Sequence, residues 1–180
     1  MATDPEGKKL YTASADCFIR FWDVKSGKAL KSFEAHGNAI ISMTVNHRLM
    51  YTASVDATAK CWVTEHGDNT VVYKGHGLSV TQAKFYKGLG NKRNVYFFNH
   101  ATFPLVITGC GDGVVRCYDA KSGHLLRTYG GHEGTIMAIQ MSGDRIFTAT
   151  TDGIVRMFKI DWEFVKYVLT FLPNLTKAIS

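Results

Sequence analysis

The chain has 180 residues, of which 46% are apolar and 12% aromatic, so it can bury a core of its own and its composition argues against intrinsic disorder. Its formal charge of +6 comes from lysines and arginines that are spread along the chain, which is typical of a solvated surface and argues against a dedicated nucleic-acid or acidic-lipid footprint. The four cysteines show no CxxC pair and no metal-ligand spacing, so we expect no metal site.

Three features predict where the protein resides. Unpaired cysteines without a framework spacing are typical of the reducing interior of the cell. The first residues, MATDPEGKK, contain no apolar stretch of the kind that opens a secretory signal. The longest apolar-rich stretch, residues 164–172, has about half the length of a membrane span. We therefore expect a soluble, intracellular and cytoplasmic protein with no membrane partner.

The first predicted elements surround Asp16, in the segment TASADCFIRFWD. Similar segments follow around Asp56 (TASVDATAKCWV), Asp112 (TGCGDGVVRCYD) and Asp152 (TATTDGIVRMFK). Each has a threonine four residues before the aspartate and an aromatic residue six residues after it. The aspartates lie 40, 56 and 40 residues apart, so the chain contains four copies of one structural unit.

Each unit is predicted to be an antiparallel meander. The residues on both sides of the aspartate alternate apolar with polar and are rich in valine, isoleucine, phenylalanine, tyrosine and threonine, which indicates β-strands. The short link that carries the aspartate indicates a tight turn, because an aspartate side chain can accept hydrogen bonds from the amides that follow it. The predicted fold class is therefore all-β.

The first and third units depart from the pattern. Residues 4–14, DPEGKKLYTAS, resemble a turn and the second strand of a unit, so the first unit is expected to lack its opening loop. The third unit carries an insertion over residues 87–103, which includes Lys92, Arg93, Tyr96, Phe97 and Phe98. Basic residues beside aromatic ones can stack on bases or hold a peptide, so the insertion can be a partner contact. The alternative is an extended hairpin that packs under a neighbouring unit.

The chain after Ile160 allows two interpretations. Residues 164–171 are β-rich enough to form the outer strand of the last unit, but Phe164, Val168, Phe171 and Leu175 would equally line one face of a helix. We favour the strand. The predicted domain then covers residues 1–172, with 173–180 as a polar tail outside the fold.

The units resemble the WD-repeat (WD40) β-propellers, whose repeat of about forty residues runs from a Gly-His pair to a Trp-Asp pair. Trp22-Asp23 is a full Trp-Asp pair, and Gly75-His76 and Gly131-His132 match the Gly-His pair, which Ala35-His36 nearly does. The resemblance covers residues 4–160 and implies about four blades. Since propellers of this family commonly close a ring of seven, it also implies an incomplete ring. An isoform or fragment of a longer protein, completed by further blades or by self-association, would fit this pattern.

The resemblance implies a hydrogen-bonded chain of histidine, threonine, aspartate and an aromatic residue inside each blade. Such a chain satisfies a buried carboxylate, and its recurrence in each unit marks it as architecture rather than as a hydrolase triad. The first unit lacks the histidine, and Phe158 of the last has no donor. The implied sets are Thr12, Asp16 and Trp22; His36, Thr52, Asp56 and Trp62; His76, Thr108, Asp112 and Tyr118; and His132, Thr148, Asp152 and Phe158.

The resemblance also implies where partners bind. Family members use the face that carries the Gly-His loops and aspartate turns, with contacts three and five residues after the histidine and one before the aspartate. In this chain those positions are Ala39, Ile41 and Val55; Ser79, Thr81 and Gly111; and Thr135, Met137 and Thr151. None is charged, whereas a reader of phosphorylated peptides needs arginines there. A hydrophobic anchor is expected instead.

The expected function is a non-catalytic scaffold for protein or peptide partners. No phosphate-binding loop, nucleophile elbow or metal cluster is present in the sequence, so we expect neither an enzyme nor a cofactor. Two alternatives are a substrate-recognition subunit of a ubiquitin ligase and an RNA-binding propeller that uses the insertion. Nucleic-acid binding of that kind would weaken steeply with salt.

Overall fold

The computed structural model describes residues 1–88 and 104–165, and these residues form four antiparallel β-sheets. Strands of one sheet follow one another along the chain, as the meander pattern predicted. The first sheet contains β1 (Ala2–Thr3), β2 (Lys9–Ala13), β3 (Phe18–Asp23) and β4 (Ala29–Glu34). The second contains β5 (Ile40–Asn46), β6 (Leu49–Ser54), β7 (Ala59–Val63) and β8 (Asn69–Tyr73).

The third and fourth sheets repeat this plan. The third contains β9 (Val80–Tyr86), β10 (Leu105–Cys110), β11 (Val115–Asp119) and β12 (Leu125–Tyr129). The fourth has three strands in the described residues, β13 (Ile136–Ser142), β14 (Arg145–Thr150) and β15 (Val155–Lys159). The prediction of an all-β fold with four strand-turn-strand units is confirmed.

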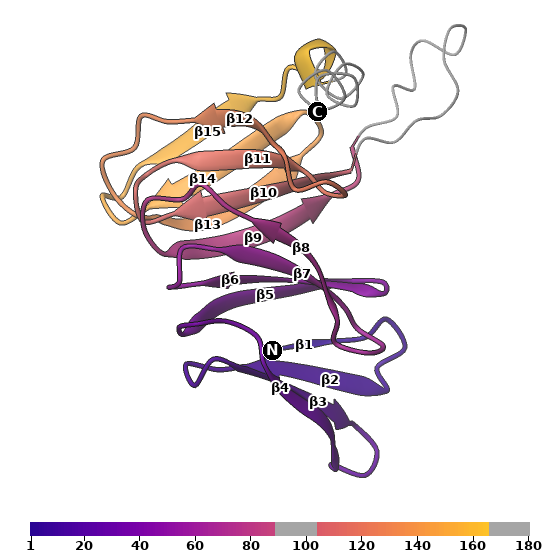
Figure 1. Cartoon of the computed structure of the whole chain (residues 1–180). Helices are drawn as coiled ribbons and strands as arrows, with labels where there is room; N and C mark the ends of the chain where they lie inside the picture. The colour runs from indigo at the N-terminus through magenta and orange to yellow at the C-terminus, as the bar shows by residue number, and fades with distance from the viewer. Residues whose placement is uncertain (89–103, 166–180) are drawn as a thin grey trace, which may run out of the picture.

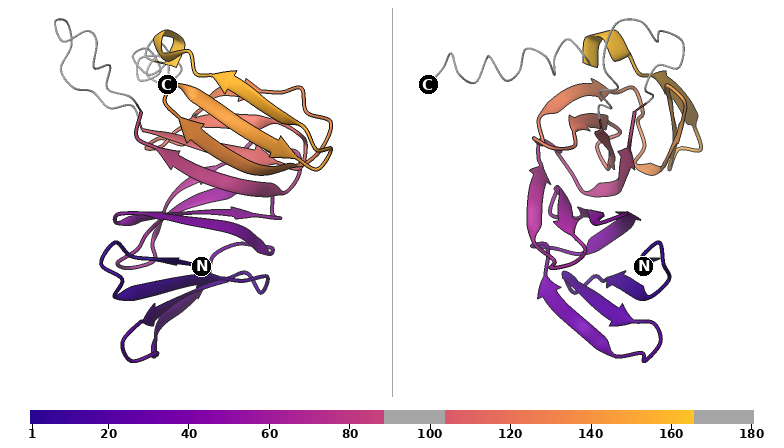
Figure 2. Two further views of the ribbon diagram at one scale, coloured as in Figure 1. Left: turned by 180° about the vertical axis from the view of Figure 1, so that it is seen from behind. Right: turned by 90° about the vertical axis from the view of Figure 1, so that its right-hand side faces the viewer.

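The sheets stack face to face in chain order, from the indigo first sheet to the orange and yellow last one (Figure 1). The first and last sheets lie at opposite ends of the stack in both further views, so the described sheets form an open arc (Figure 2). The first strands of neighbouring sheets pack against one another along the arc, β5 beside β9 and β9 beside β13.

The core consists of three clusters in the described residues, one at each junction between consecutive sheets. Because side chains alternate along a strand, each sheet has a forward face, which meets the next sheet, and a backward face, which meets the previous one. Residues three and five positions after the turn aspartate lie on the forward face, as Ile19 and Phe21 do in the first sheet. They pack against Met50 and Trp62, which lie six residues before and six after Asp56 on the backward face of the second sheet.

The turn after each aspartate requires a left-handed backbone at the next residue. Gly113 and Gly153 meet this requirement with φ values of 72° and 80°. Cys17 and Ala57 occupy the same position in the first two units with φ values of 73° and 62°, although a side chain disfavours this conformation. The repeated turn therefore imposes its geometry on residues that do not prefer it.

The outer strand expected over residues 164–171 is wrong for its first residues. Residues 162–165 form a helical turn, which lies at the end of the fourth sheet (Figure 1). Asp161 caps this turn, since its carboxylate accepts a hydrogen bond from the amide of Phe164 at 3.1 Å. Val165 is fully buried in the cluster between the third and fourth sheets, and residues 166–171 lie outside the described residues.

Candidate functional site

The second unit contains a continuous hydrogen-bonded chain that joins three of its strands and loops. The indole N–H of Trp62 donates to the hydroxyl of Thr52 at 2.8 Å. The Thr52 hydroxyl lies 2.7 Å from Nε2 of His36, and Nδ1 of His36 lies 2.8 Å from the carboxylate of Asp56. This order of donors fits a neutral histidine that carries its proton on Nδ1.

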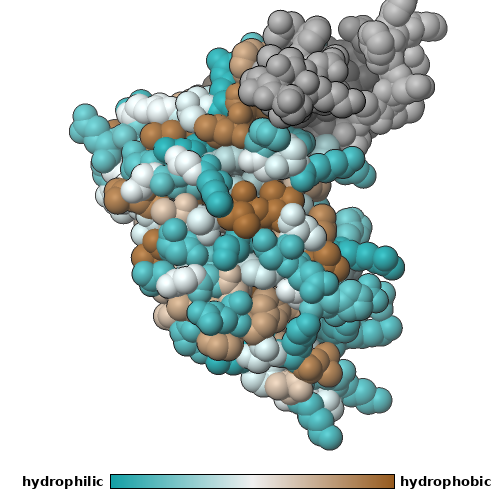
Figure 3. Space-filling view, in the orientation of Figure 1, coloured by the Kyte–Doolittle hydropathy of each residue, from teal (hydrophilic) through white to brown (hydrophobic). Residues whose placement is uncertain are grey.

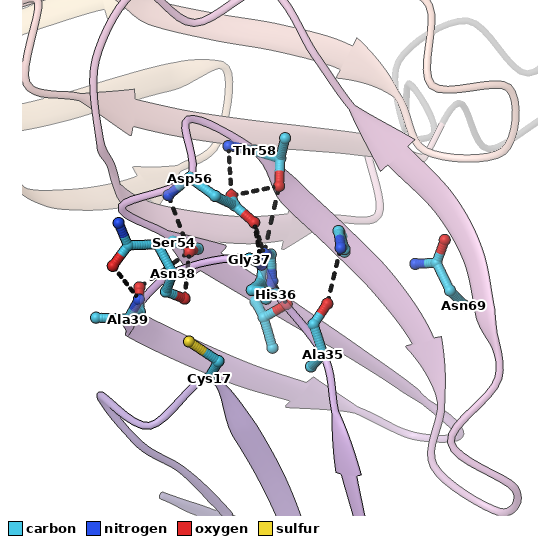
Figure 4. Close-up of polar contacts among 12 residues, drawn as sticks. Cys17, Ala35, His36, Gly37, Asn38, Ala39, Ser54, Asp56, Thr58 and Asn69 are labelled. Atoms are coloured by element: carbon cyan, nitrogen blue, oxygen red, sulfur yellow. Dashed lines mark hydrogen bonds and ion pairs between the residues drawn. The ribbon is translucent and has the colours of Figure 1, made fainter.

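Asp56 also holds the turn in which it lies (Figure 4). Its carboxylate accepts hydrogen bonds from the amide of Gly37 at 3.1 Å and from the amide and hydroxyl of Thr58 at 3.0 and 2.6 Å. These donors keep the pKa of Asp56 below its usual value although the residue is partly buried. Burial lowers the pKa of His36, although Asp56 acts in the opposite direction. The lowered pKa favours the neutral imidazole.

The third unit arranges its set differently. Nε2 of His76 lies 2.8 Å from the hydroxyl of Thr108, but the guanidinium of Arg116 forms two hydrogen bonds with Asp112, at 3.1 and 2.8 Å. Together with other donors, Arg116 lowers the pKa of Asp112 to about 2 despite its burial. The hydroxyl of Tyr118 donates to the carbonyl of Lys74 at 2.8 Å. Within the described residues, Nδ1 of His76 is buried without a hydrogen-bond partner, and burial together with Arg116 lowers the pKa of His76 to about 4.

The two end units keep parts of the set. In the first, Trp22 donates to Thr12 at 2.8 Å, while Asp16 pairs with Arg20 at 2.7 Å. In the fourth, Nε2 of His132 lies 2.7 Å from the Thr148 hydroxyl, and Phe158 makes an edge contact with the imidazole at 6.1 Å between ring centroids. Thr150 connects the histidine to Asp152 through hydrogen bonds to both.

The buried position of these sets decides what they can do chemically. Thr52 and Thr108 are fully buried, and Thr148 is 1% exposed, so their hydroxyls have no access to a substrate. Each hydroxyl is also engaged by a histidine of its own unit. The arrangement joins the loop before each sheet to the aspartate turn and holds the blade together.

The predicted partner-binding positions lie side by side in pairs. The amide of the residue before each aspartate donates to the carbonyl of the residue three after each histidine, in the second, third and fourth units. The pairs are Val55 and Ala39 at 3.0 Å, Gly111 and Ser79 at 2.9 Å, and Thr151 and Thr135 at 3.0 Å. We call the surface formed by these pairs and the residues five after each histidine the loop face.

The residues five after each histidine are bulge residues in the first strand of their sheet. The register of β5 with β6 shifts around Ile41, and that of β13 with β14 shifts around Met137. A bulge leaves its extra residue unpaired and redirects its side chain, and these two side chains are 48% and 54% exposed. Together with Val55, which is 37% exposed, they give the loop face its apolar character.

Thr81 occupies the same position in the third unit, but the structure buries it, unlike Ile41 and Met137. It is 8% exposed, and its hydroxyl donates to the carbonyls of Gly109 and Ile136. The second of these bonds crosses from the third sheet to the fourth. Thr81 therefore joins two blades and is not free to contact a partner.

Leu78 is a further exposed apolar residue that the repeat pattern does not single out. This residue lies two after His76, where the second and fourth units have Asn38 and Gly134, and its side chain is 56% exposed. A side-chain atom added at Gly111 would lie 3.3 Å from it, so Leu78 rests on the neighbouring aspartate turn. Comparison of the units with one another would have identified it as the apolar exception in its loop.

Comparison with known proteins settles the family. The model of the family described as "WD domain, G-beta repeat" matches residues 1–23, 27–63 and 123–159, which are more than half of the chain. The chain belongs to the WD40 family. The insertion of the third WD40 unit lies within the unmatched residues 64–122.

Two curated relatives share the WD40 repeat. An uncharacterized WD repeat-containing protein of Schizosaccharomyces pombe is 40% identical over 57 residues, which are 31% of this chain and 14% of that protein. The WD repeat-containing protein 91 homolog of Dictyostelium discoideum is 35% identical over 69 residues, which are 37% of this chain and 9% of that protein. The chain spans a small part of both relatives.

Solved structures share the fold. The computationally designed Ika4 protein superimposes with a TM-score of 0.70 at 23% identity, over 85% of this chain and 86% of that one. The designed Ika8 protein gives the same TM-score and identity over 85% of this chain but 43% of its own. WD40 repeats generally serve protein interaction without catalysis. The relatives share the repeat with this chain, and the solved structures share its fold.

The insertion of this WD40 chain, with Lys92, Arg93, Tyr96, Phe97 and Phe98, lies outside the described residues. A groove of 690 Å³ lies beside its root, between the turn that joins β5 to β6 and the end of β9. The basic residues that line it are His47, Arg48, Lys84 and Lys87. Phe85 also lines the groove, but its ring is stacked on Tyr51 at 5.4 Å between centroids.

Within residues 1–88 and 104–165, no cluster of histidine, cysteine, aspartate and glutamate side chains has the composition of a metal site. No helix in this part of the chain is long and apolar enough to cross a membrane.

Proposed function

We propose that this WD40 chain is a non-catalytic interaction scaffold whose loop face binds an apolar segment of a protein partner. The observation that carries the proposal is the exposure of the apolar residues Ile41, Val55 and Met137 on this face and of Leu78 beside Ser79. Exposed apolar residues cost solubility and are typical of surfaces that a partner covers.

The chemistry of the loop face supports an apolar anchor over an acidic or phosphorylated one. Its predicted contact positions carry no arginine or lysine. Recognition of a phosphate group normally uses bidentate arginine pairs, which these positions cannot supply. The backbone bonds between the paired loops fix the positions of the side chains before a partner arrives, which reduces the entropy lost on binding.

The side of the arc that faces the viewer in Figure 3 shows brown apolar residues in small separate patches between teal polar ones. The exposed apolar residues of the loop face are the surface that we propose for an apolar partner segment.

Selection from a random peptide library on the immobilised 180-residue chain tests the proposal. We expect enriched peptides to share a large apolar residue and to lose at least tenfold in affinity with the variants Ile41→Asp and Met137→Asp. The variant Leu125→Asp is the matched control, because Leu125 is 45% exposed on the outermost strand of the third sheet. Acidic or phosphorylated peptides that bind all three variants equally would contradict the proposal.

The basic groove beside the insertion favours RNA binding as a second candidate. Four basic residues line it, but Phe85 is already stacked on Tyr51 and is poorly placed to stack on a base. Titration of labelled single-stranded RNA at several salt concentrations separates the two candidates. Affinity that falls steeply with salt and is lost in Arg48→Ala and Lys84→Ala would favour RNA, whereas no measurable binding removes it.

A further inference from the structure

Each interior junction of the arc uses the same pair of faces. On the forward side of each junction, the residues three and five after the aspartate are fully buried or nearly so. They are Ile19 and Phe21 at 0% and 3% exposure, Ala59 and Cys61 at 0% and 2%, and Val115 and Cys117 at 0%. Three consecutive sheets thus bury the same positions under the next sheet.

The fourth sheet leaves these positions open. Val155 and Met157 stand three and five after Asp152, and they are 67% and 51% exposed. They pair with Ala149 and Phe147 of β14, so the open forward face is apolar across both strands. The equivalent residues of the other three sheets are buried by the next sheet. The forward face of the fourth sheet therefore has the same kind of packing surface, and no sheet of the described residues covers it.

The first sheet is open on the opposite side. Its backward face carries Leu10 and Trp22, six residues before and six after Asp16, and both are only partly buried. Their counterparts in the second and third units are buried, Met50 and Val106 completely and Trp62 and Tyr118 to 5% and 1% exposure. One chain therefore presents both halves of the junction that it uses three times internally.

We propose that a second copy of this chain covers these faces. The forward face of the fourth sheet in one copy packs on the backward face of the first sheet in the other, and the reciprocal contact forms at the same time. One such contact alone would leave two faces open and permit a growing chain of copies, whereas two reciprocal contacts close a twofold-symmetric ring of eight sheets.

The curvature of the arc supports closure by one further copy. The four sheets superimpose equally well on 86% of the Ika4 chain and on 43% of the Ika8 chain. An arc of this shape therefore fits within less than half of a longer designed chain, so the fold accommodates further sheets beyond the ends of the arc. This proposal concerns the ends of the arc and does not depend on what the loop face binds.

Sedimentation velocity on the complete 180-residue chain tests the proposal. We expect a compact dimer with twice the mass of one chain. The variants Val155→Lys and Met157→Lys on the forward face, and Leu10→Lys on the backward face, should each raise the dimer dissociation constant at least tenfold. Leu125→Lys, on an outermost strand, is the matched control and should leave it unchanged. Far-ultraviolet circular dichroism checks that each variant is folded.

Mixing distinguishes head-to-tail closure from other dimers. An equimolar mixture of Met157→Lys and Leu10→Lys contains one intact junction per pair, so heterodimers should form where each variant alone is monomeric. A dimer made by forward face on forward face would survive Leu10→Lys, which would overturn the proposal. A monomer at all concentrations, meaning that residues of the same chain cover the faces, or a ladder of larger oligomers, would overturn it as well.

Discussion

Thr52 holds two partners through one hydroxyl, which accepts from Trp62 and contacts His36, in a fully buried position. Substitution Thr52→Val preserves the shape but leaves an indole N–H and an imidazole nitrogen without a partner. We expect the free energy of unfolding to fall by about 2–3 kcal/mol. Urea denaturation followed by tryptophan fluorescence measures the change.

Thr12→Val is the matched control for this substitution. Thr12 receives the Trp22 bond but has no histidine partner among the described residues, and it is partly exposed, so water can replace the lost partner. A loss of about 1 kcal/mol or less is expected. Equal losses at the two positions would show that the histidine adds nothing to the set.

The residue after each turn aspartate has a left-handed backbone, so substitutions there should change the free energy of unfolding in opposite directions, depending on whether glycine is introduced or removed. Ala57→Gly removes the cost of a side chain in the left-handed region and should raise the free energy of unfolding by about 1 kcal/mol or less. Gly113→Ala should lower it by more than this amount, because its Cβ atom would lie 2.3 Å from the carbonyl oxygen of His132.

Melting temperatures of the two variants and the unchanged chain measure these effects. Gly153→Ala serves as the intermediate case, since φ is 80° but no atom lies within 4 Å of the added carbon. A destabilised Ala57→Gly variant would show that the turn is less constrained than its geometry indicates.

At the scale of the elements, the strands determine which thiols can react. Cys61 and Cys117 lie on forward faces under the next sheet, and Cys110 is fully buried at the end of β10. Burial raises the pKa of Cys117 to about 12, which removes the reactive thiolate at neutral pH. Cys17 lies in a turn and is only partly buried.

We therefore expect one thiol to react quickly with Ellman's reagent in the folded protein and four to react after unfolding. Cys17→Ser should abolish the fast reaction. Rapid reaction of two or more thiols would mean that a junction between sheets opens on the time scale of labelling.

The strands and turns could be predicted because four units repeat the same local pattern around an aspartate. The end of the chain could not, since residues 164–171 suit a strand and a helix equally well and the Asp161 cap decides for a helical turn at 162–165. Likewise, no local pattern shows that Arg116 occupies the carboxylate of Asp112 and leaves Nδ1 of His76 without a partner. Thr81 is buried where the third sheet meets the fourth, and its hydroxyl donates to the carbonyl of Ile136 in that sheet. This contact depends on tertiary packing, which a local sequence pattern does not show.

At the scale of the whole molecule, three histidines make the stability depend on pH, of which His36 and His132 are buried and His76 is partly buried. Burial lowers the pKa of His36, His76 and His132, that of His76 to about 4. The unfolded chain binds protons at these residues once the pH falls below their ordinary value of about 6.5, whereas the folded chain does not. The contribution of these histidines to the free energy of unfolding should therefore be constant above this pH and fall below it, with His76 losing stability until about pH 4.

Melting temperatures between pH 8 and pH 4 measure this dependence. The slope from each such histidine is at most about 1.4 kcal/mol per pH unit. Protonation of Asp112, whose pKa is about 2, adds a further loss only at more acidic pH. The variant His76→Gln should show a smaller slope, and a melting temperature that does not change between pH 6.5 and pH 4.5 would contradict the assignment.

The backbone bonds between Val55 and Ala39, Gly111 and Ser79, and Thr151 and Thr135 use only main-chain atoms. Substitution of Ala39, Val55 or Ser79 therefore leaves these bonds in place, whereas the hydroxyls of Thr135 and Thr151 also make hydrogen bonds of their own. Variation at the first three positions would change the proposed binding surface at little cost to folding. A combinatorial library randomised there, with Ile41, Leu78 and Met137 added, would offer a route to new binding specificities on the same frame.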